Sequence, residues 1–232
     1  MTLELAGVQA AVQGIPILHR VDLRLQQGEV LALLGRNGAG KTTTLRTIMG
    51  LTDLSGGTLA LDGKSLSALP TWQRARAGIY LVPEDGGVFQ ELTVLENLRL
   101  SGTGRPEEVL GSFPELRPLW QRRAALLSGG ERKILALARA ALSGSRWLLI
   151  DEPSLGLAPG VLRRLGQAIA EMRQSCGVLL VEQNLRFAQG VADRYALMQR
   201  GATVDAGPIA DLRQSPFFAQ AMSFGNQEGE PA

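Results

Sequence analysis

With 232 residues, the chain is long enough to bury a sizeable core, as one domain with an inserted subdomain or as two small domains. Its 45% of hydrophobic and 20% of charged residues are values typical of globular proteins. The net charge of +2 is too small to indicate a nucleic-acid partner, and no basic run is interleaved with aromatic residues as a nucleic-acid surface would need, so we expect none.

The cysteine and histidine counts exclude several kinds of site. Cys176 is the single cysteine, so no disulfide can form within the chain and we expect a reducing compartment. His19 is the single histidine, which excludes Cys/His zinc sites and any triad that needs histidine. The N-terminus lacks the features of a signal peptide, and no apolar run approaches the ~18 residues of a membrane span. We therefore expect a cytoplasmic protein that works at a membrane only through a partner.

Residues 2–34 are predicted to form β-strands. Apolar and polar residues alternate over residues 21–25, as in a strand with one buried face. Residues 30–34 are continuously apolar, as in a strand that is buried on both faces. Further along the chain, residues 55–57 are expected to open another short strand, and Asp62-Gly63 to form a tight turn.

The most specific motif is a glycine-rich loop that directly follows the apolar run. It has the pattern G-x-x-x-x-G-K-[ST] and comprises Gly35, Arg36, Asn37, Gly38, Ala39, Gly40, Lys41, Thr42 and Thr43. Glycines let the backbone curl so that its N–H groups converge on a phosphate at the start of the next helix. Lys41 adds a positive charge for the β- and γ-phosphates, and the hydroxyl of Thr42 is a ligand for Mg²⁺.

The alternative interpretation of this loop is a glycine-rich turn before a helix. Context disfavours that interpretation, because a buried-strand pattern precedes the loop. In addition, a helical pattern of Leu45, Ile48 and Met49 follows it and ends at Gly50. The motif therefore predicts a site for a nucleoside triphosphate.

Residues 85–127 have a different character from the flanking sequence. The region is predicted to contain short helices that are interrupted by Pro106, Pro114 and Pro118. We interpret it as a small helical insertion rather than as an independent domain. At the end of the chain, residues 225–232 are polar and are expected to be disordered.

A second anion-binding site is predicted at the start of the helix that follows. Its sequence begins with Ser128, Gly129, Gly130 and Glu131. Its apolar positions recur at helical spacing, at Ile134, Leu137, Ala138, Ala141 and Leu142. Free N–H groups, a hydroxyl donor and the positive end of the helix dipole would attract an anion there. The alternative is that these residues form a plain helix cap. We favour an anion site, because the chain has one triphosphate loop with which a second anion-binding segment can be paired.

Two further apolar runs, residues 147–150 and 178–181, are typical of buried parallel strands, with a helix predicted at about 160–173 between them. Asp151 and Glu152 follow the first run, at the edge where ligands bind in open α/β sheets. Asp151 suits an Mg²⁺ site beside the phosphate loop, and Glu152 is placed to activate a water against the γ-phosphate. An ordinary strand-ending turn is the alternative, which the neighbouring phosphate loop disfavours.

These motifs resemble the nucleotide-binding subunit of ABC transporters. The resemblance covers about residues 3–225 and rests on the phosphate loop, on LSGGE at 127–131 and on LLIDEPS at 148–154. It implies an α/β ABC-type P-loop ATPase over residues 1–224, with a mainly parallel core sheet, an N-terminal antiparallel β subdomain and a small helical subdomain inserted at about 85–140. It also implies ATP and Mg²⁺ as cofactors. Two cassettes of this family dimerise head to tail, so that LSGGE of one closes on the ATP of the other.

Other strings are similar to the ATPase subunit of branched-chain amino-acid uptake systems and their amide or urea relatives. They are VPE at 82–84, LTVLENL at 92–98, FPEL at 113–116, SLGLAP at 154–159 and VEQN at 181–184. The resemblance implies a subunit on the inner face of the cell membrane that energises uptake through separate permease subunits and indirectly serves a solute-binding protein. The second cassette would be a homologous subunit or a copy of this chain.

Three positions depart from the commonest pattern of the family. Glu84 stands where most cassettes have a glutamine that reaches the metal, and a carboxylate is also a good Mg²⁺ ligand. Gln183 replaces the usual switch histidine, so we expect hydrolysis to depend on Glu152 rather than on a histidine relay. Val12 corresponds to the aromatic residue that stacks on adenine, and it offers apolar contact without a π-face.

Other functions of a cassette remain open at this point. An export or lipid-trafficking cassette would share every catalytic residue with an uptake cassette. A soluble ABC ATPase of DNA repair or translation would usually carry two cassettes in one chain or long coiled-coil arms, and this sequence shows neither pattern. The transported solute is not encoded here, because the contacts with it lie in other polypeptides.

Overall fold

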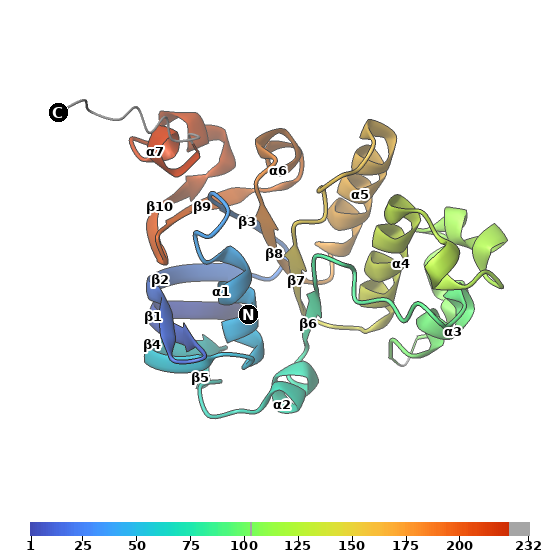
Figure 1. The fold of residues 1–232 in the computed structure, drawn as a ribbon, viewed down its shortest axis with the longest axis horizontal. Coiled ribbons are helices and arrows are strands. Elements are labelled where there is room, and N and C mark those ends of the chain that lie inside the picture. Colours follow the sequence, from blue (N-terminus) through green and yellow to red (C-terminus); the bar gives the residue numbers. More distant parts are fainter. Residues whose placement is uncertain (103, 223–232) are drawn as a thin grey trace.

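The computed structural model describes residues 1–102 and 104–222, and a ten-stranded sheet runs through them in the order β5-β4-β1-β2-β10-β9-β3-β8-β7-β6. The strands are β1 (Thr2–Val12), β2 (Ile15–Gln26), β3 (Val30–Leu34), β4 (Asp53–Leu61), β5 (Lys64–Ser65), β6 (Ile79–Val82), β7 (Trp147–Asp151), β8 (Gly177–Glu182), β9 (Arg194–Gln199) and β10 (Ala202–Pro208). The α-helices are α1 (Lys41–Met49), α2 (Thr71–Arg76), α3 (Val94–Arg99), α4 (Gly129–Leu142), α5 (Pro159–Met172), α6 (Leu185–Val191) and α7 (Phe218–Met222). Figure 1 shows the first strands at one end of the long axis and α3 with α4 at the other.

The antiparallel part of the sheet consists of β1, β2, β4 and β5. The alternation predicted for residues 21–25 is confirmed, because the three apolar side chains are buried and the two polar ones are exposed. The prediction that residues 55–57 open the next strand is wrong, since β4 already begins at Asp53. Gly57 lies inside β4 at a φ of +76°, and a Cβ there would be 2.3 Å from the carbonyl oxygen of Gly7. This glycine therefore permits the close approach of β1 and β4 at a register shift.

The parallel part of the sheet consists of β6, β7, β8, β3 and β9. β3, β7 and β8 are buried along their whole length, as expected for strands with both faces covered. Successive side chains of β3 enter two different cores. Val30, Ala32 and Leu34 pack with residues of α4, α5 and α6, whereas Leu31 and Leu33 pack with α1 and the antiparallel strands. The predicted fold class, with a mainly parallel core sheet and an N-terminal antiparallel part, is confirmed.

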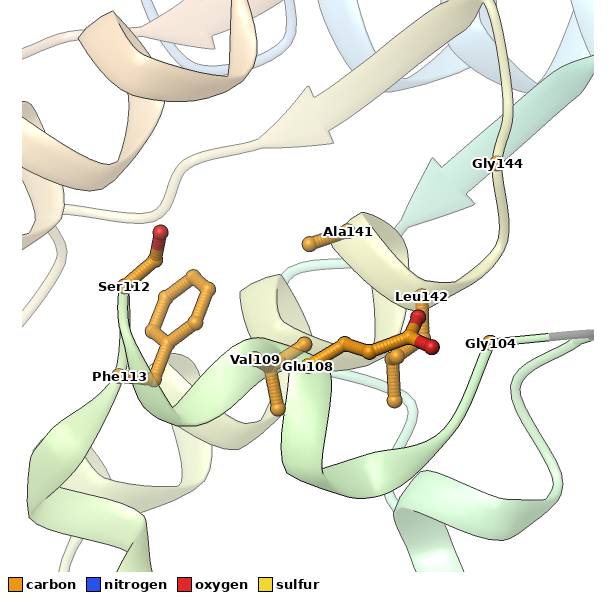
Figure 2. Close-up of a pocket in the computed structure, with 8 residues that line it drawn as sticks. All are labelled: Gly104, Glu108, Val109, Ser112, Phe113, Ala141, Leu142 and Gly144. Carbon is orange, nitrogen blue, oxygen red and sulfur yellow. The ribbon is translucent and has the colours of Figure 1, made fainter.

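The segment between β6 and β7 is helical, but its details differ from the prediction. It contains α3, the 3₁₀ helices η1 (Pro106–Leu110), η2 (Pro114–Leu119) and η3 (Ala124–Leu126), and then α4. Pro106 and Pro114 begin η1 and η2 instead of interrupting a helix, because the fixed φ of proline suits a first turn. Ala141, predicted on the apolar face of α4, is exposed and lines a hollow at the surface (Figure 2).

The predictions about the C-terminal tail and the domain bounds are not tested by the structure. The predicted disordered tail, residues 225–232, lies outside the described residues, as does the predicted domain boundary at residue 224. The bounds of the helical subdomain, about 85–140, also remain a prediction. Across residues 1–102 and 104–222, the helices lack the length and apolarity that a membrane crossing requires.

Candidate functional site

The predicted phosphate, metal and catalytic residues meet at the carboxyl edge of the parallel strands. The phosphate loop follows β3, Asp151 and Glu152 stand at the end of β7, and Gln183 follows β8. Because β8 lies between β3 and β7, the ends of all three strands are neighbours. This is the edge at which open α/β sheets bind ligands.

The phosphate loop adopts a conformation that depends on glycine. Gly38 and Gly40 have φ angles of +77° and +105°, in the region that side chains disfavour. A Cβ on Gly40 would lie 2.8 Å from Met198 Cε and 2.9 Å from Leu18 Cδ2, so this position is also tightly packed. No side chain caps the start of α1, which leaves its first N–H groups directed at the loop. The loop can therefore receive an anion at a helix N-terminus.

Lys41 is held inside this loop, with a side chain that is 3% exposed. Its Nζ donates hydrogen bonds to the carbonyl oxygens of Gly35 at 2.8 Å and Arg36 at 3.1 Å. The same Nζ lies 3.3 Å from Oε1 of Glu152. The ammonium group of Lys41 thus contacts oxygen acceptors of its own chain. Phosphate oxygens bound in the loop would compete with these acceptors for the ammonium group.

Thr42 and Asp151 are brought together as the predicted metal site requires. The Thr42 hydroxyl donates a hydrogen bond to Oδ1 of Asp151 at 3.2 Å. Burial raises the pKa of Asp151, and the bond from Thr42 opposes that rise. Glu84 shares with them a hollow of about 420 Å³.

The oxygens of these three side chains are of the kind that Mg²⁺ prefers. Among the described residues, no three acidic, His or Cys side chains are grouped closely enough to hold a metal by themselves. The residues therefore fit an ion that takes further ligands from phosphate and water.

Glu152 occupies a strained backbone position and is tightly hydrogen-bonded. Its φ of +42° is uncommon for a residue with a side chain and costs about 1 kcal/mol or more. Its backbone N–H donates to Val181 O at 3.0 Å, and Nζ of Lys133 donates to its carbonyl oxygen at 3.1 Å. Gln183 Nε2 lies 2.7 Å from each of its carboxylate oxygens and also bonds to Asn37 Oδ1. The surrounding chain thus fixes the direction of this carboxylate.

A hollow of about 720 Å³ opens beside this carboxylate. It is lined by Asn37, Thr42, Glu84, Glu152, Ser154, Leu155, Gly156, Leu157, Leu162, Glu182, Gln183 and Asn184. A second hollow, of about 320 Å³, lies between η1 and the end of α4 (Figure 2). Its charged lining residue is Glu108, and it contains no residue of the phosphate loop. The first hollow is therefore the candidate site for a triphosphate.

The predicted second anion site does not reach this hollow within one chain. Ser128 and Gly129 are exposed, and Gly130 is half-buried. Ser128 Oγ accepts from the N–H of Glu131 at 3.2 Å, and Glu131 Oε2 accepts from the N–H of Ser128 at 2.7 Å. These bonds lower the pKa of Glu131. The four residues form a reciprocal cap on α4, and none of them lines the triphosphate hollow.

Val12, the predicted contact for a base, is the last residue of β1. It is half-buried, pairs with Ile15 across a tight turn and does not line the hollow. Its role stays a prediction.

Two polar side chains of the site were missed in the sequence. Glu182 ends β8 with 1% exposure, and Lys133 reaches from α4 to the carbonyl oxygens of Glu84 and Glu152. Glu182 could have been noticed in the sequence, because it is a charged residue directly after the apolar run 178–181. Lys133 gave no comparable signal, because its partners are backbone atoms that are distant in sequence.

Comparison with known proteins finds relatives along most of the chain. Residues 18–155 match the family described as ABC transporter. The high-affinity branched-chain amino acid transport ATP-binding protein BraG of Pseudomonas aeruginosa is 39% identical over 211 residues, which cover 87% of this chain and 91% of BraG. The probable branched-chain amino acid transport ATP-binding protein LivF of Archaeoglobus fulgidus is 34% identical over 221 residues, with coverages of 91% and 94%.

Similarity also extends to an export protein and to a solved structure. The lipopolysaccharide export system ATP-binding protein LptB of Acidithiobacillus ferridurans is 34% identical over 214 residues, with coverages of 88% and 89%. A structure described as the ATP-binding subunit of an ABC transporter superposes with a TM-score of 0.81 at 28% identity and covers 92% of each chain. The sequence and the fold therefore lead to the same group of proteins.

Proposed function

The chain belongs to the ABC transporter family, and from this premise we propose that it is the ATP-hydrolysing subunit of an uptake system for branched-chain amino acids or related small solutes. ATP hydrolysis is the activity of the family. The observation that carries the proposal for this chain is the group formed by the buried Lys41 and the half-buried Glu152 and Gln183 beside the phosphate loop. A lysine, a general base and a hydrogen-bonding amide are the side chains that triphosphate hydrolysis needs.

Residues 35–43 bind the triphosphate in this proposal. Backbone N–H groups of the loop and of the start of α1 donate to phosphate oxygens. Lys41 moves its ammonium group from the Glu152 carboxylate to the β- and γ-phosphate oxygens. Thr42, Asp151 and Glu84 would hold Mg²⁺, which would supply positive charge to the phosphates.

Glu152 acts as the general base once the phosphates have taken Lys41 from it. Its carboxylate accepts a proton from a water molecule, whose oxygen forms a bond to the γ-phosphorus. At the same time the bond from the γ-phosphorus to the oxygen that bridges to the β-phosphate breaks, which yields ADP and phosphate. Gln183, which already donates to Glu152, keeps that carboxylate aimed into the hollow.

A second cassette completes the site. The start of α4 exposes Ser128 and Gly129, and neither lines the triphosphate hollow of its own chain. The helix end still carries the positive dipole and free N–H groups that attract an anion. We assign it to the nucleotide of the partner, which is a homologous subunit or another copy of this chain.

The remaining parts of the proposed assembly are membrane proteins. Separate permease subunits carry the solute, a solute-binding protein delivers it, and this chain docks at the inner face of the cell membrane. BraG and LivF, whose names contain branched-chain amino acid transport, support this assignment. The similarity to LptB supports a second candidate function, energising lipopolysaccharide export.

Co-purification distinguishes the two candidates. The chain would be purified from its host with its membrane subunits, reconstituted in liposomes, and tested for ATP hydrolysis with leucine-loaded binding protein or with lipopolysaccharide. Stimulation by the leucine-loaded protein, absent in a Lys41→Ala assembly, supports uptake. Stimulation by lipopolysaccharide alone would contradict it and favour export.

A further inference from the structure

Glu182, at the end of β8, is a buried carboxylate that the mechanism above does not use. Its Oε1 accepts a hydrogen bond from the N–H of Ser154 at 3.0 Å, and its Oε2 accepts one from the Ser154 hydroxyl at 2.8 Å. Oε2 also accepts from the N–H groups of Gln183 at 3.2 Å and Asn184 at 3.1 Å. Four donors therefore converge on one carboxylate.

These donors belong to two loops that are far apart in sequence. Ser154 follows β7 and opens the loop of residues 154–157, whereas Gln183 and Asn184 follow β8. Asn184 also caps α6, so a shift of this segment moves the start of a helix. Glu182 is the side chain that bonds to both segments, across the ends of two paired strands.

The environment of Glu182 is costly for a charged group. Burial raises the pKa of its carboxyl, and the hydrogen bonds from Ser154, Asn184 and Gln183 oppose the rise. Among the ion pairs of residues 1–102 and 104–222, none involves Glu182. Lys133 attracts this carboxylate electrostatically without forming an ion pair with it, so the direct contacts that hold it in place are those of the four donors. A displacement of one donor therefore changes its bonds to the others.

We propose that Glu182 is a positioning residue that couples the loop of residues 154–157 to Gln183. Leu155 in this loop is an apolar side chain with 56% exposure, which a second cassette would cover on dimer formation. The resulting movement of Ser154 shifts Glu182 and, through it, the backbone of Gln183. The side-chain amide of Gln183 moves with that backbone, and this amide bonds to Glu152. Contact with the partner thus adjusts the aim of the general base. The effect on turnover rests on the proposed function, in which Glu152 and Gln183 serve ATP hydrolysis.

Ser154→Ala tests the coupling with little risk to folding, since it removes one hydroxyl. We expect the N–H groups of Gln183 and Asn184 to exchange with deuterium about 3- to 10-fold faster. The reason is that the Glu182 carboxylate, which accepts from both groups, is no longer held in place by the Ser154 hydroxyl. Amide exchange followed by NMR in the nucleotide-free chain measures this. Ser143→Ala removes a half-buried hydroxyl that bonds to Ala140 O at 2.6 Å, and it should leave both amides unchanged. Unchanged exchange at both amides in Ser154→Ala would overturn the proposal.

Kinetics separate positioning from a merely structural role. Glu182→Gln should lower kcat about 3- to 10-fold with an unchanged KM for ATP, and Ser154→Ala should lower kcat by a similar factor. In the Glu182→Gln background, the Ser154→Ala change should have no further effect, because the link is already broken. Independent, multiplicative losses would overturn the coupling. If Glu182→Gln does not fold, the exchange experiment on Ser154→Ala still decides the proposal.

The two experiments also separate this inference from the proposed function. Amide exchange requires no ATP hydrolysis, so the coupling can hold even if the parent chain is inactive. A parent chain that hydrolyses ATP while both variants match it in kcat and in exchange refutes the coupling alone.

Discussion

The phosphate loop and the start of α4 both present glycines at a helix N-terminus, but they are built in opposite ways. At the phosphate loop, Lys41 and Asp151 are each 4% exposed, and each contacts a residue that is distant in sequence, Glu152 for Lys41 and Thr42 for Asp151. At α4, Ser128 is exposed, and its hydroxyl and backbone N–H bond to Glu131 in the first turn of the same helix. Long-range packing builds the first region, and local capping builds the second.

The pKa directions follow the same division. Burial raises the pKa of Asp151, whereas hydrogen bonds to Ser128 lower that of Glu131. Charges that are packed away from water are costly until a ligand interacts with them. A capped helix end at the surface is stable by itself and free to meet a partner. This difference fits the proposed function, in which the phosphate loop is completed by nucleotide and the start of α4 by a second cassette.

The largest expected effect belongs to the buried half. Glu152→Gln should lower the turnover number about 10²- to 10⁴-fold, because an amide cannot accept the proton of the attacking water. ATP binding should persist, so the variant should accumulate as a dimer when ATP is added. Steady-state hydrolysis and sedimentation velocity measure the two effects. Hydrolysis at the parental rate would exclude Glu152 as the general base.

Lys41→Ala tests whether the buried half binds nucleotide without the other half. Charge-assisted hydrogen bonds worth about 1.5–3 kcal/mol are lost, so the affinity for ATP should fall about 10- to 100-fold. Isothermal titration calorimetry on the monomer measures the change. Lys64→Ala, which removes an exposed lysine of β5, is the matched control and should bind as the parent does. Equal affinity of the two variants would contradict the role of Lys41.

Ser128→Ala tests the exposed half. Turnover should fall roughly 10-fold, the scale of one lost charge-assisted hydrogen bond, while ATP binding to the monomer stays unchanged. Loss of the cap should also lower the free energy of unfolding by about 1 kcal/mol.

Thr93→Ala supplies the control, because Thr93 and Glu96 form the same reciprocal cap on α3. This variant should lose similar stability, measured by urea unfolding, and keep its turnover. If both variants lost turnover equally, the effect of Ser128 would be one of stability rather than of ATP contact.

The smallest expected effect concerns pH. Gln183, which we expect to take the place of the usual switch histidine, has no titratable group, so kcat should show no inflection near pH 6.5. Gln183→His should introduce one, with a change of a few fold across it. Rate profiles between pH 5.5 and 8.5, a range of about three units around that value, compare the two chains. An inflection near pH 6.5 in the parent would show that another group titrates in the reaction.

The parts that are predictable from the sequence are those set by local pattern. The buried strand of residues 30–34 and the helix that ends at Gly50 follow from periodicity and glycine placement. The meeting of Thr42 with Asp151 follows from the rule that the carboxyl ends of the parallel strands of one sheet lie along the same edge.

The parts that were missed depend on contacts between distant segments. Ala141 has the helical spacing of the apolar face, yet it lines a hollow between η1 and the end of α4, and the spacing within one helix does not show where a neighbouring segment leaves such a hollow. The start of β4 at Asp53 depends on pairing with β1, which residues 55–57 do not reveal by themselves. Glu182 and Lys133 form hydrogen bonds with backbone atoms of other loops. Because any residue type offers these atoms, no motif or spacing in the sequence reveals such partners.

Mixing two impaired variants tests most directly the claim that each ATP site is shared between chains. Lys41→Ala retains an intact Ser128, and Ser128→Ala retains an intact phosphate loop. In a mixed dimer, one site therefore combines the two intact halves. We predict that the mixture hydrolyses ATP faster than either variant alone at the same total concentration. Activity equal to the mean of the two separate variants would contradict the claim, because Ser128 would then serve the phosphate loop of its own chain.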